Sequence, residues 1–245
     1  MHISEEGIVL RDFHRDEDRI ITILTKKQGL LTAFANKANR PRSSLASSTE
    51  LLCYSNFELF QNRERCVVDK ADAMHNFFGL RANVEDLALA CWLAQLMHEL
   101  APQGDFAGEY INLLLTSLYL LEKQSRPRPL IKAAYELRLL TMAGFMPDLI
   151  ACSECGETPA GKMFFSLEGS LFCSECHPQY NENLHPVGDG VLAAMRHSIY
   201  AEPRRTFSFS LSEDGLAALA RISEAFTLYQ LEKTFPALEF YRSVV

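Results

Sequence analysis

Residues 7–37 read GIVLRDFHRDEDRIITILTKKQGLLTAFANK, and this stretch decides the fold of the N-terminal part of the chain. It contains three short runs rich in β-branched and aromatic residues, namely GIVLRDF, RIITILTK and LLTAFANK. Within each run apolar and polar side chains partly alternate, which is typical of half-buried β-strands. Gln28-Gly29 lies between the second and third runs and has the composition of a tight hairpin turn. The stretch therefore predicts three strands joined by short connections.

Two further runs of the same kind follow this stretch. A polar, proline-containing loop over residues 36–48 precedes LLCYSNFELFQ, and CVVD comes shortly afterwards. Five short strands within the first 70 residues suit a small closed barrel. The OB-fold is the five-stranded barrel whose face and loops bind oligonucleotides, so we expect an OB-fold in this region.

After Asn83 the apolar residues recur every three or four positions, which indicates helices. Asn83 has the side chain of a helix N-cap. A second helix is expected after Asp105 and a third between Pro129 and Gly144, where proline favours the first turn and glycine the C-terminal stop. The sequence thus predicts an α+β protein, with an OB-fold domain at 1–80, a helical domain at 81–245, and a cysteine module at 150–180 inserted into the helices.

The tetrapeptide CSEC occurs twice, from Cys152 to Cys155 and from Cys173 to Cys176. Two Cys-x-x-Cys pairs separated by 17 residues have the spacing of a four-thiolate zinc site. The residues between them, KMFFSLEGSLF, read as a hairpin that turns at Glu168-Gly169 and brings the two pairs together. We therefore expect one Zn²⁺ in a zinc-ribbon-like module. Free thiols or disulfides within each pair are the alternatives.

A metal held by four thiolates has no open coordination position for a water molecule, so the expected role of the zinc is structural. Motifs for catalysis are also missing. His98-Glu99 is not followed by the second histidine of a HExxH site, and no phosphate-binding glycine loop occurs. The sequence therefore predicts a protein that is not an enzyme.

The net charge is −7, yet the cations are unevenly distributed. Residues 19–49 contain no acidic residue and carry Arg19 together with five cations that we expect the hairpin to gather at one edge of the barrel, where they would bind phosphates: Lys26, Lys27, Lys37, Arg40 and Arg42. The aromatic residues Tyr54, Phe57 and Phe60 lie on the next strand. They are expected mainly in the core rather than stacked on bases.

No targeting or membrane segment is expected. The N-terminus, MHISEEGIVLRD, lacks the positive start and apolar stretch of a signal peptide. The most apolar window, YINLLLTSLYLL, is too short to cross a bilayer. These features favour a cytoplasmic protein without a membrane partner.

Three parts of the sequence together resemble the RecO family of bacterial recombinational-repair proteins. They are the N-terminal stretch GIVLRDFHRDEDRIITILTKKQGLLTAFANKANRPRSSL, the helical segment AYELRLLTMAGFMPDL, and the CSECG that follows it with the second CSEC. The resemblance implies a non-enzymatic recombination mediator of the bacterial cytoplasm and nucleoid. Such proteins bind single- and double-stranded DNA, anneal complementary strands, and work with RecR and single-strand-binding protein (SSB) to load the RecA recombinase.

The resemblance also implies roles for particular residues. Lys37 and Arg40 occupy the basic loop of the barrel through which the family binds DNA, and Arg42 lies nearby. The family binds the C-terminal tail of SSB through its helical domain, where Lys132 and Arg138 are the candidate partner-binding residues. The C-terminus, FPALEFYRSVV, departs from the basic ending of the family.

Two other classes of function remain open from the residues alone. One is a zinc-bearing adaptor for protein partners, in which the basic loop is incidental and DNA does not bind. The other is a metallohydrolase, which would need an open metal position and would lose activity, but not its fold, when the metal is removed.

Overall fold

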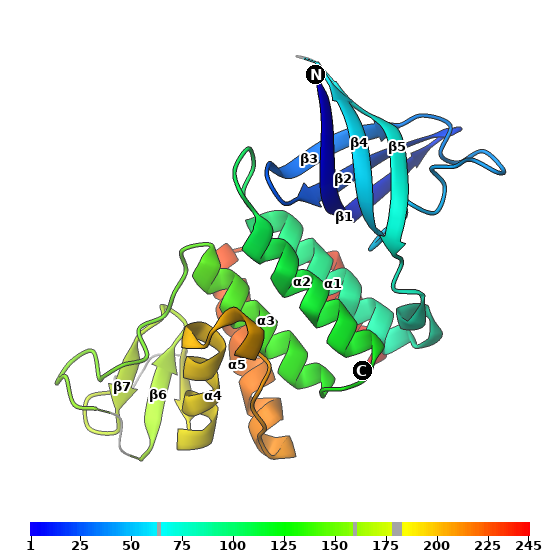
Figure 1. Ribbon diagram of the computed structural model, residues 1–245. Helices are drawn as coiled ribbons and strands as arrows, with labels where there is room; N and C mark the ends of the chain where they lie inside the picture. The colour runs from blue at the N-terminus through cyan, green and yellow to red at the C-terminus, as the bar shows by residue number, and fades with distance from the viewer. Residues whose placement is uncertain (63–64, 159–160, 178–182) are drawn as a thin grey trace. The chain divides into compact units, whose positions relative to one another are not determined.

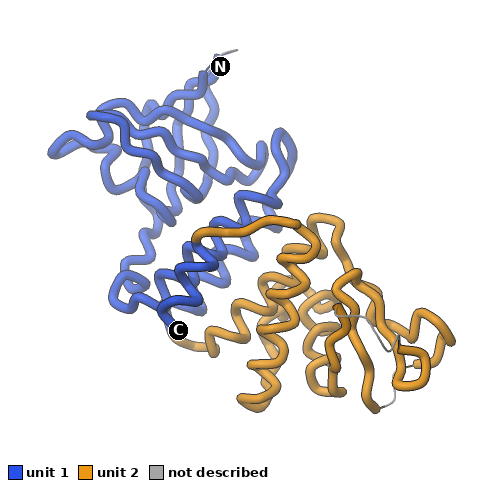
Figure 2. The backbone as a smooth tube through the Cα atoms, turned by 180° about the vertical axis from the view of Figure 1, so that it is seen from behind, with its two compact units in different colours: residues 1–123, 237–245 blue, residues 124–236 orange. Residues whose placement is uncertain are grey.

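A computed structural model describes residues 1–62, 65–158, 161–177 and 183–245. The chain divides into two compact units (Figure 2). Unit 1 comprises residues 1–123 and 237–245, and unit 2 comprises residues 124–236. Unit 1 therefore contains the five N-terminal strands and the first two long helices. The predicted domain boundary at residue 80 stays a prediction.

Five strands of unit 1 close into a barrel in the order β1-β2-β3-β5-β4 (Figure 1). All neighbouring pairs are antiparallel except β3 and β5, whose parallel pairing closes the barrel. The interior is filled by buried apolar side chains, among them Val9, Ile21, Ile23, Phe57 and Leu59. This arrangement confirms the predicted five-stranded barrel. Its strands are β1 (His2–Arg15), β2 (Asp18–Thr25), β3 (Gly29–Ala35), β4 (Tyr54–Gln61) and β5 (Cys66–His75).

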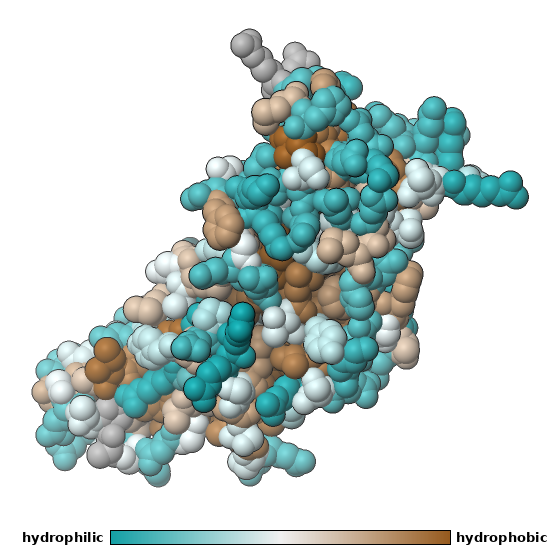
Figure 3. Space-filling view, viewed as in Figure 1, coloured by the Kyte–Doolittle hydropathy of each residue, from teal (hydrophilic) through white to brown (hydrophobic). Residues whose placement is uncertain are grey.

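The strand β1 is longer than the sequence pattern predicts, because it serves two neighbours. Its first half pairs with β4, from His2 opposite Phe60 onward, and its second half pairs with β2. The register shifts between Val9 and Arg11, where a β-bulge interrupts the ladder. The barrel surface on the face shown in Figure 3 is mostly hydrophilic, with a few apolar side chains between the polar ones.

Helices α1 (Val84–Leu100) and α2 (Gly108–Glu122) pack on each other and contact strands of the barrel, and the 3₁₀ helix η1 (Phe78–Ala82) precedes them. Asn83 caps α1 as predicted, because its Oδ1 accepts the backbone N–H groups of Glu85 at 2.8 Å and Asp86 at 3.1 Å. The final helix α6 (Pro236–Val244) also belongs to unit 1 and was not predicted.

Unit 2 is built on three helices that pack on one another, α3 (Arg128–Met142), α4 (Asp189–Tyr200) and α5 (Glu213–Leu231). The 3₁₀ helix η2 (Pro203–Arg205) follows α4. As predicted, Gly144 follows the end of α3 with a positive φ of 97°. Among the residues that the structure describes, no helix is long and apolar enough to cross a membrane.

A small antiparallel sheet is inserted between α3 and α4 (Figure 1). It has the order β7-β6-β8, with β6 (Met163–Ser166), β7 (Leu171–Cys173) and β8 (Leu184–Val187). The predicted hairpin between the two CSEC sequences is therefore confirmed, and Gly169 lies in its turn with a φ of 96°. The third strand, β8, lacks a clear strand pattern and was not predicted.

Candidate nucleic-acid interface and metal centre

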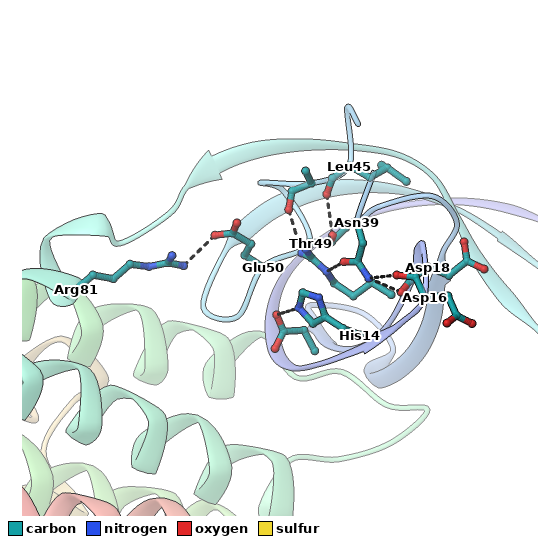
Figure 4. Close-up of polar contacts among 11 residues, drawn as sticks. His14, Asp16, Asp18, Asn39, Leu45, Thr49, Glu50 and Arg81 are labelled. Carbon is teal, nitrogen blue, oxygen red and sulfur yellow. Dashed lines mark hydrogen bonds and ion pairs between the residues drawn. The ribbon is translucent and has the colours of Figure 1, made fainter. Parts of the chain in front are cut away.

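The loop that follows β3 is held to the barrel by Arg19 of β2. This residue is only 5% exposed. Its guanidinium donates to Asn39 Oδ1 at 3.2 Å, to the carbonyl of Ala46 at 3.0 Å and to Thr49 Oγ1 at 3.1 Å. At the end of the loop, Glu50 pairs with Arg81 at 2.9 Å, and Figure 4 shows the polar contacts of this region. Arg19 thus orders the loop and is not part of its surface.

An acidic turn, Asp16 to Asp18, connects β1 to β2 and lies against the same loop (Figure 4). The side-chain amide of Asn39 donates to the carbonyls of Asp16 at 3.1 Å and Asp18 at 2.7 Å. The backbone N–H of Lys37 donates to Asp18 Oδ1 at 2.7 Å. Arg40 Nε donates to Glu17 Oε2 at 2.6 Å, and this ion pair raises the pKa of Arg40. The carboxylates of Glu17 and Asp18 therefore lie against a loop that contains no acidic residue of its own.

The loop nevertheless presents two cations to solvent. Lys37 and Arg42 are both exposed, with φ values of 57° and 63°. Within the described part of the chain, no ion pair involves either side chain. The charge of Arg40, which is also exposed, is by contrast partly compensated by Glu17.

The five predicted cations do not gather at one edge of the barrel, so that prediction was wrong. Lys26 and Lys27 lie in the β2–β3 turn, while the basic loop begins after the opposite end of β3. The seven residues of β3 separate these ends by about 20 Å. Lys26 forms an ion pair with Glu6, and the hydrogen bond lowers the pKa of Glu6 and raises that of Lys26.

The aromatic residues of β4 are expected mainly in the core, but the structure buries only one of the three completely. Phe57 is fully buried in the barrel, and Tyr54 is half-buried with its hydroxyl donating to Glu6 Oε2 at 2.5 Å. Phe60 remains 37% exposed and lies against the ring of His2. None of these three rings faces the basic loop through a described contact.

The four cysteines of the two CSEC sequences converge, and their Sγ atoms all lie within 4.8 Å of one another. Each pair sits in the same kind of turn. The N–H of Gly156 donates to the carbonyl of Cys152 at 2.9 Å, and that of His177 donates to the carbonyl of Cys173 at 3.0 Å. The Ser153 N–H donates to the carbonyl of Leu171 at 2.8 Å and thereby joins the first turn to β7. Local backbone hydrogen bonds therefore aim all four thiols at one point.

The chemistry of this cluster fits one metal ion. A tetrahedral zinc site with bonds of about 2.3 Å requires sulfur atoms about 3.8 Å apart, and Cys155 and Cys173 have an Sγ–Sγ distance of 3.9 Å. Burial opposes ionisation of Cys152, but hydrogen bonds from the backbone at Cys155, Cys173 and Glu154 outweigh it and lower its pKa to about 6. The neighbouring sulfurs of Cys173 and Cys155 raise the pKa of Cys176 to about 12. Four thiolates thus need a cation between them.

Two histidines, His177 and His98, lie outside the cysteine cluster. His177 stacks on Phe164, with ring centroids 4.1 Å apart, and its Nδ1 lies 2.8 Å from the carbonyl of Ser174. It is not in the metal-binding group found among the described residues. His98 is half-buried on α1, and burial lowers its pKa.

The two predicted partner-binding residues lie on α3 and have contacts within unit 2. Lys132 is only 3% exposed, and its Nζ lies 2.7 Å from Glu136 and 2.8 Å from Glu224. Arg138 is half-buried and donates to the carbonyl of Ala201 at 3.1 Å. The ammonium group of Lys132 is therefore not part of the surface in this structure.

Nearly the whole chain is similar to known proteins. Residues 1–77 match the family model described as Recombination protein O N terminal, and residues 81–239 match Recombination protein O C terminal. The DNA repair protein RecO of Acetivibrio thermocellus is 31% identical over 245 residues, which cover 99% of this chain and 97% of that protein. The protein of the same name from Symbiobacterium thermophilum is 31% identical over 241 residues, 96% of this chain and 94% of the relative. That from Alkaliphilus metalliredigens is 35% identical over 179 residues, 72% and 73% of the two chains.

Proposed function

The chain belongs to the RecO family of DNA repair proteins, and on that basis we propose that it is a non-enzymatic recombination mediator. In this role it binds single- and double-stranded DNA without reading the base sequence, and it anneals complementary strands. Together with RecR it helps to load RecA onto DNA that SSB covers.

The observation that carries the DNA-binding proposal is the pair of exposed cations, Lys37 and Arg42, on the loop ordered by Arg19. Phosphate contacts of this kind supply affinity without sequence information. Arg40 is a third contact, because its ion pair with Glu17 is solvent-exposed and therefore weak enough to be exchanged for a phosphate. Lys26 and Lys27 would form a separate, secondary contact at the other end of β3.

The cysteine cluster supports a structural metal, which we propose to be Zn²⁺. Cys152, Cys155, Cys173 and Cys176 would supply four thiolate ligands and complete its coordination. Because these residues lie between α3 and α4, the ion would fix the small sheet on the helices of unit 2.

We further propose that unit 2 receives the C-terminal tail of SSB. Lys132 and Arg138 would support that surface from within, since Lys132 is buried and Arg138 binds the carbonyl of Ala201. They would thus position α3 rather than touch the tail directly.

Fluorescence anisotropy with a labelled oligothymidine, measured over a range of salt concentrations, tests DNA binding. We expect the double variant Lys37→Ala, Arg42→Ala to bind more weakly and to reduce the salt slope by about 1.4, since each phosphate contact with a single strand contributes about 0.7. The matched control removes two exposed cations elsewhere in unit 1, Lys70 and Arg242, whose described ion pairs are on the surface. Unchanged affinity and salt slope in the first variant would refute the proposed role of the loop.

A second experiment tests the mediator role. Two complementary strands coated with SSB are mixed with the protein, and duplex formation is followed with intact SSB and with SSB that lacks its C-terminal tail. We expect annealing that depends on the tail. A zinc-bearing adaptor would instead bind SSB without binding or annealing free DNA.

A further inference from the structure

Three apolar side chains form a row on the outer face of the barrel. Phe13 of β1 is paired with Ile20 of β2, which is paired with Phe34 of β3. Residues directly opposite each other on adjacent strands point to the same face of a sheet. The next residues along the strands, Ile21 and Ala33, are fully buried in the barrel, so the row points outward. Phe13 is 65% exposed, and Ile20 and Phe34 are half-buried.

Cations flank this row. The guanidinium carbon of Arg65 lies 5.8 Å from the centroid of the Phe34 ring, a cation–π contact. Arg11 lies two residues from Phe13 on the same strand, where it is exposed and paired with Thr22. The alternation of aromatic and basic side chains is the arrangement with which proteins hold single-stranded nucleic acid.

A polar pocket adjoins the row on the side of Thr22 and Thr32. Its volume is about 330 Å³, which is within the range of ligand pockets. Its remaining polar lining comes from Gln61, Asn62, Arg65, His98 and Gln103. These side chains carry donors and acceptors suited to the edge of a base or to a phosphate. The outer face of β1, β2 and β3 thus combines flat rings, cations and a polar recess.

We propose that this face binds single-stranded DNA, with two unpaired bases stacked on Phe13 and Phe34 and their phosphates near Arg11 and Arg65. The inference rests on the proposed function and adds a second contact surface, which accepts only unpaired strands, together with the residues that form it. A duplex buries the faces of its bases, so only an unpaired strand can use the rings. Phe34 lies three residues before Lys37, so a bound strand would continue from the face to the basic loop.

The test compares the double variant Phe13→Leu, Phe34→Leu with wild type by fluorescence anisotropy. Three ligands of equal length are used: oligothymidine, an abasic oligonucleotide and a duplex. We expect the variant to bind oligothymidine at least tenfold more weakly, because each stacked base adds to affinity, and to bind the other two within about twofold of wild type. An equal loss for all three ligands, or no loss for oligothymidine, would overturn the proposal.

A matched control is Phe78→Leu. Phe78 is 59% exposed in the same unit, and the guanidinium carbon of Arg81 lies 5.5 Å from its ring centroid. It reproduces the exposed ring with an arginine but lies outside the row, and we expect no change. The variants Phe13→Tyr and Phe34→Tyr keep the flat rings and should retain affinity.

Photo-crosslinking of wild-type protein to an oligonucleotide containing 5-iodouracil does not depend on the folding of a variant. Crosslinked peptides should contain Phe13 or Phe34, and their absence from a crosslinked product would contradict the stacking. The two double variants together distinguish a failure of this inference from a failure of the proposed function. If Lys37→Ala, Arg42→Ala weakens binding while the leucine variant does not, this inference fails and the proposed function stands. If wild type shows no salt-dependent DNA binding, the proposed function itself fails.

Discussion

The guanidinium of Arg19 donates a hydrogen bond of 3.1 Å to the hydroxyl of Thr49, which in turn donates to the carbonyl of Leu45 at 2.7 Å. This contact joins the strand β2 to a loop residue thirty positions later in the sequence. It places a buried cation under the basic loop, where the positive charge stabilises the loop conformation. The two exposed cations of the loop, Lys37 and Arg42, depend on that conformation.

Replacing Arg19 by Met should therefore destabilise the barrel and weaken DNA binding indirectly. Three acceptors would lose a donor in a buried position, at a cost of about 2–4 kcal/mol in the free energy of unfolding. Arg19→Lys should not restore stability, because an ammonium group cannot reproduce the geometry of the guanidinium. Urea unfolding measures the effect. Lys27→Met removes an exposed cation in the turn that follows the same strand; it is the control and should change stability by less than about 0.5 kcal/mol.

Gly29 should be intolerant of any side chain. Its φ is +64°, and a β-carbon would lie 2.0 Å from the carbonyl oxygen of Pro102, which accepts the N–H of Leu30 at 2.9 Å. Gly104 separates the effect of the positive φ from that of the close contact, because its φ is +71° but nothing lies within 4 Å of an added β-carbon. We expect Gly104→Ala to cost about 1 kcal/mol for the left-handed backbone, and Gly29→Ala to cost clearly more. Equal melting temperatures for the two variants would contradict the close approach.

The elements that could be predicted from the sequence depend on local signals. The barrel strands follow from alternation and turn residues, Asn83 marks a helix start with its own side chain, and the repeated CSEC encodes its own turns. The extension of β1 to His2 could not be predicted, because its mostly polar residues enter the sheet through backbone hydrogen bonds with β4. The helix α6 has only nine residues, which are too few for a helical period of apolar side chains to be recognised in the sequence.

The candidate site depended on contacts between distant segments, which a linear pattern does not contain. The acidic turn around Glu17 meets Arg40 because the β1–β2 and β2–β3 registers bring their ends together. The row of Phe13 and Phe34 was also missed in the sequence. Arg11, Phe13 and Arg15 alternate along β1 in the sequence and could have indicated this surface. The position of Phe34 beside Phe13 follows only from the pairing of both strands with β2.

Removal of the metal should destabilise unit 2. With the ion absent, thiolates at Cys152 and its neighbours would repel one another or take up protons, and the turns would lose their common centre. We expect one zinc per chain by elemental analysis, none in Cys155→Ser, and a lower melting temperature for that variant and for chelator-treated wild type. Cys66→Ala, a buried cysteine of the barrel, should keep the zinc. Full zinc content in Cys155→Ser would contradict the four-thiolate site.

The buried ion pairs of Lys132 lead to a prediction that separates a structural role from a partner-binding role. Its ammonium lies between the carboxylates of Glu136 and Glu224, and Ser223 Oγ donates to Glu136 Oε2 at 2.6 Å. Lys132→Ala leaves the carboxylate of Glu136 buried without its cation, which should cost about 3–5 kcal/mol in the free energy of unfolding. The double variant Lys132→Met, Glu136→Leu should cost less than Lys132→Ala, because an apolar pair replaces the buried charges.

Two measurements on the same variants distinguish the roles. Chemical unfolding reports the stability of unit 2, and a titration with a labelled peptide of the SSB tail reports partner binding. Lys123→Ala, an exposed lysine over the Tyr119 ring, is the control and should be neutral in both. If Lys132 acts structurally, the double variant recovers peptide binding as it recovers stability, because the peptide needs the position of α3 and not the ammonium group. If Lys132→Ala instead loses peptide binding at unchanged stability, the lysine contacts the tail directly. Its ion pairs with Glu136 and Glu224 would then be absent when the peptide is bound.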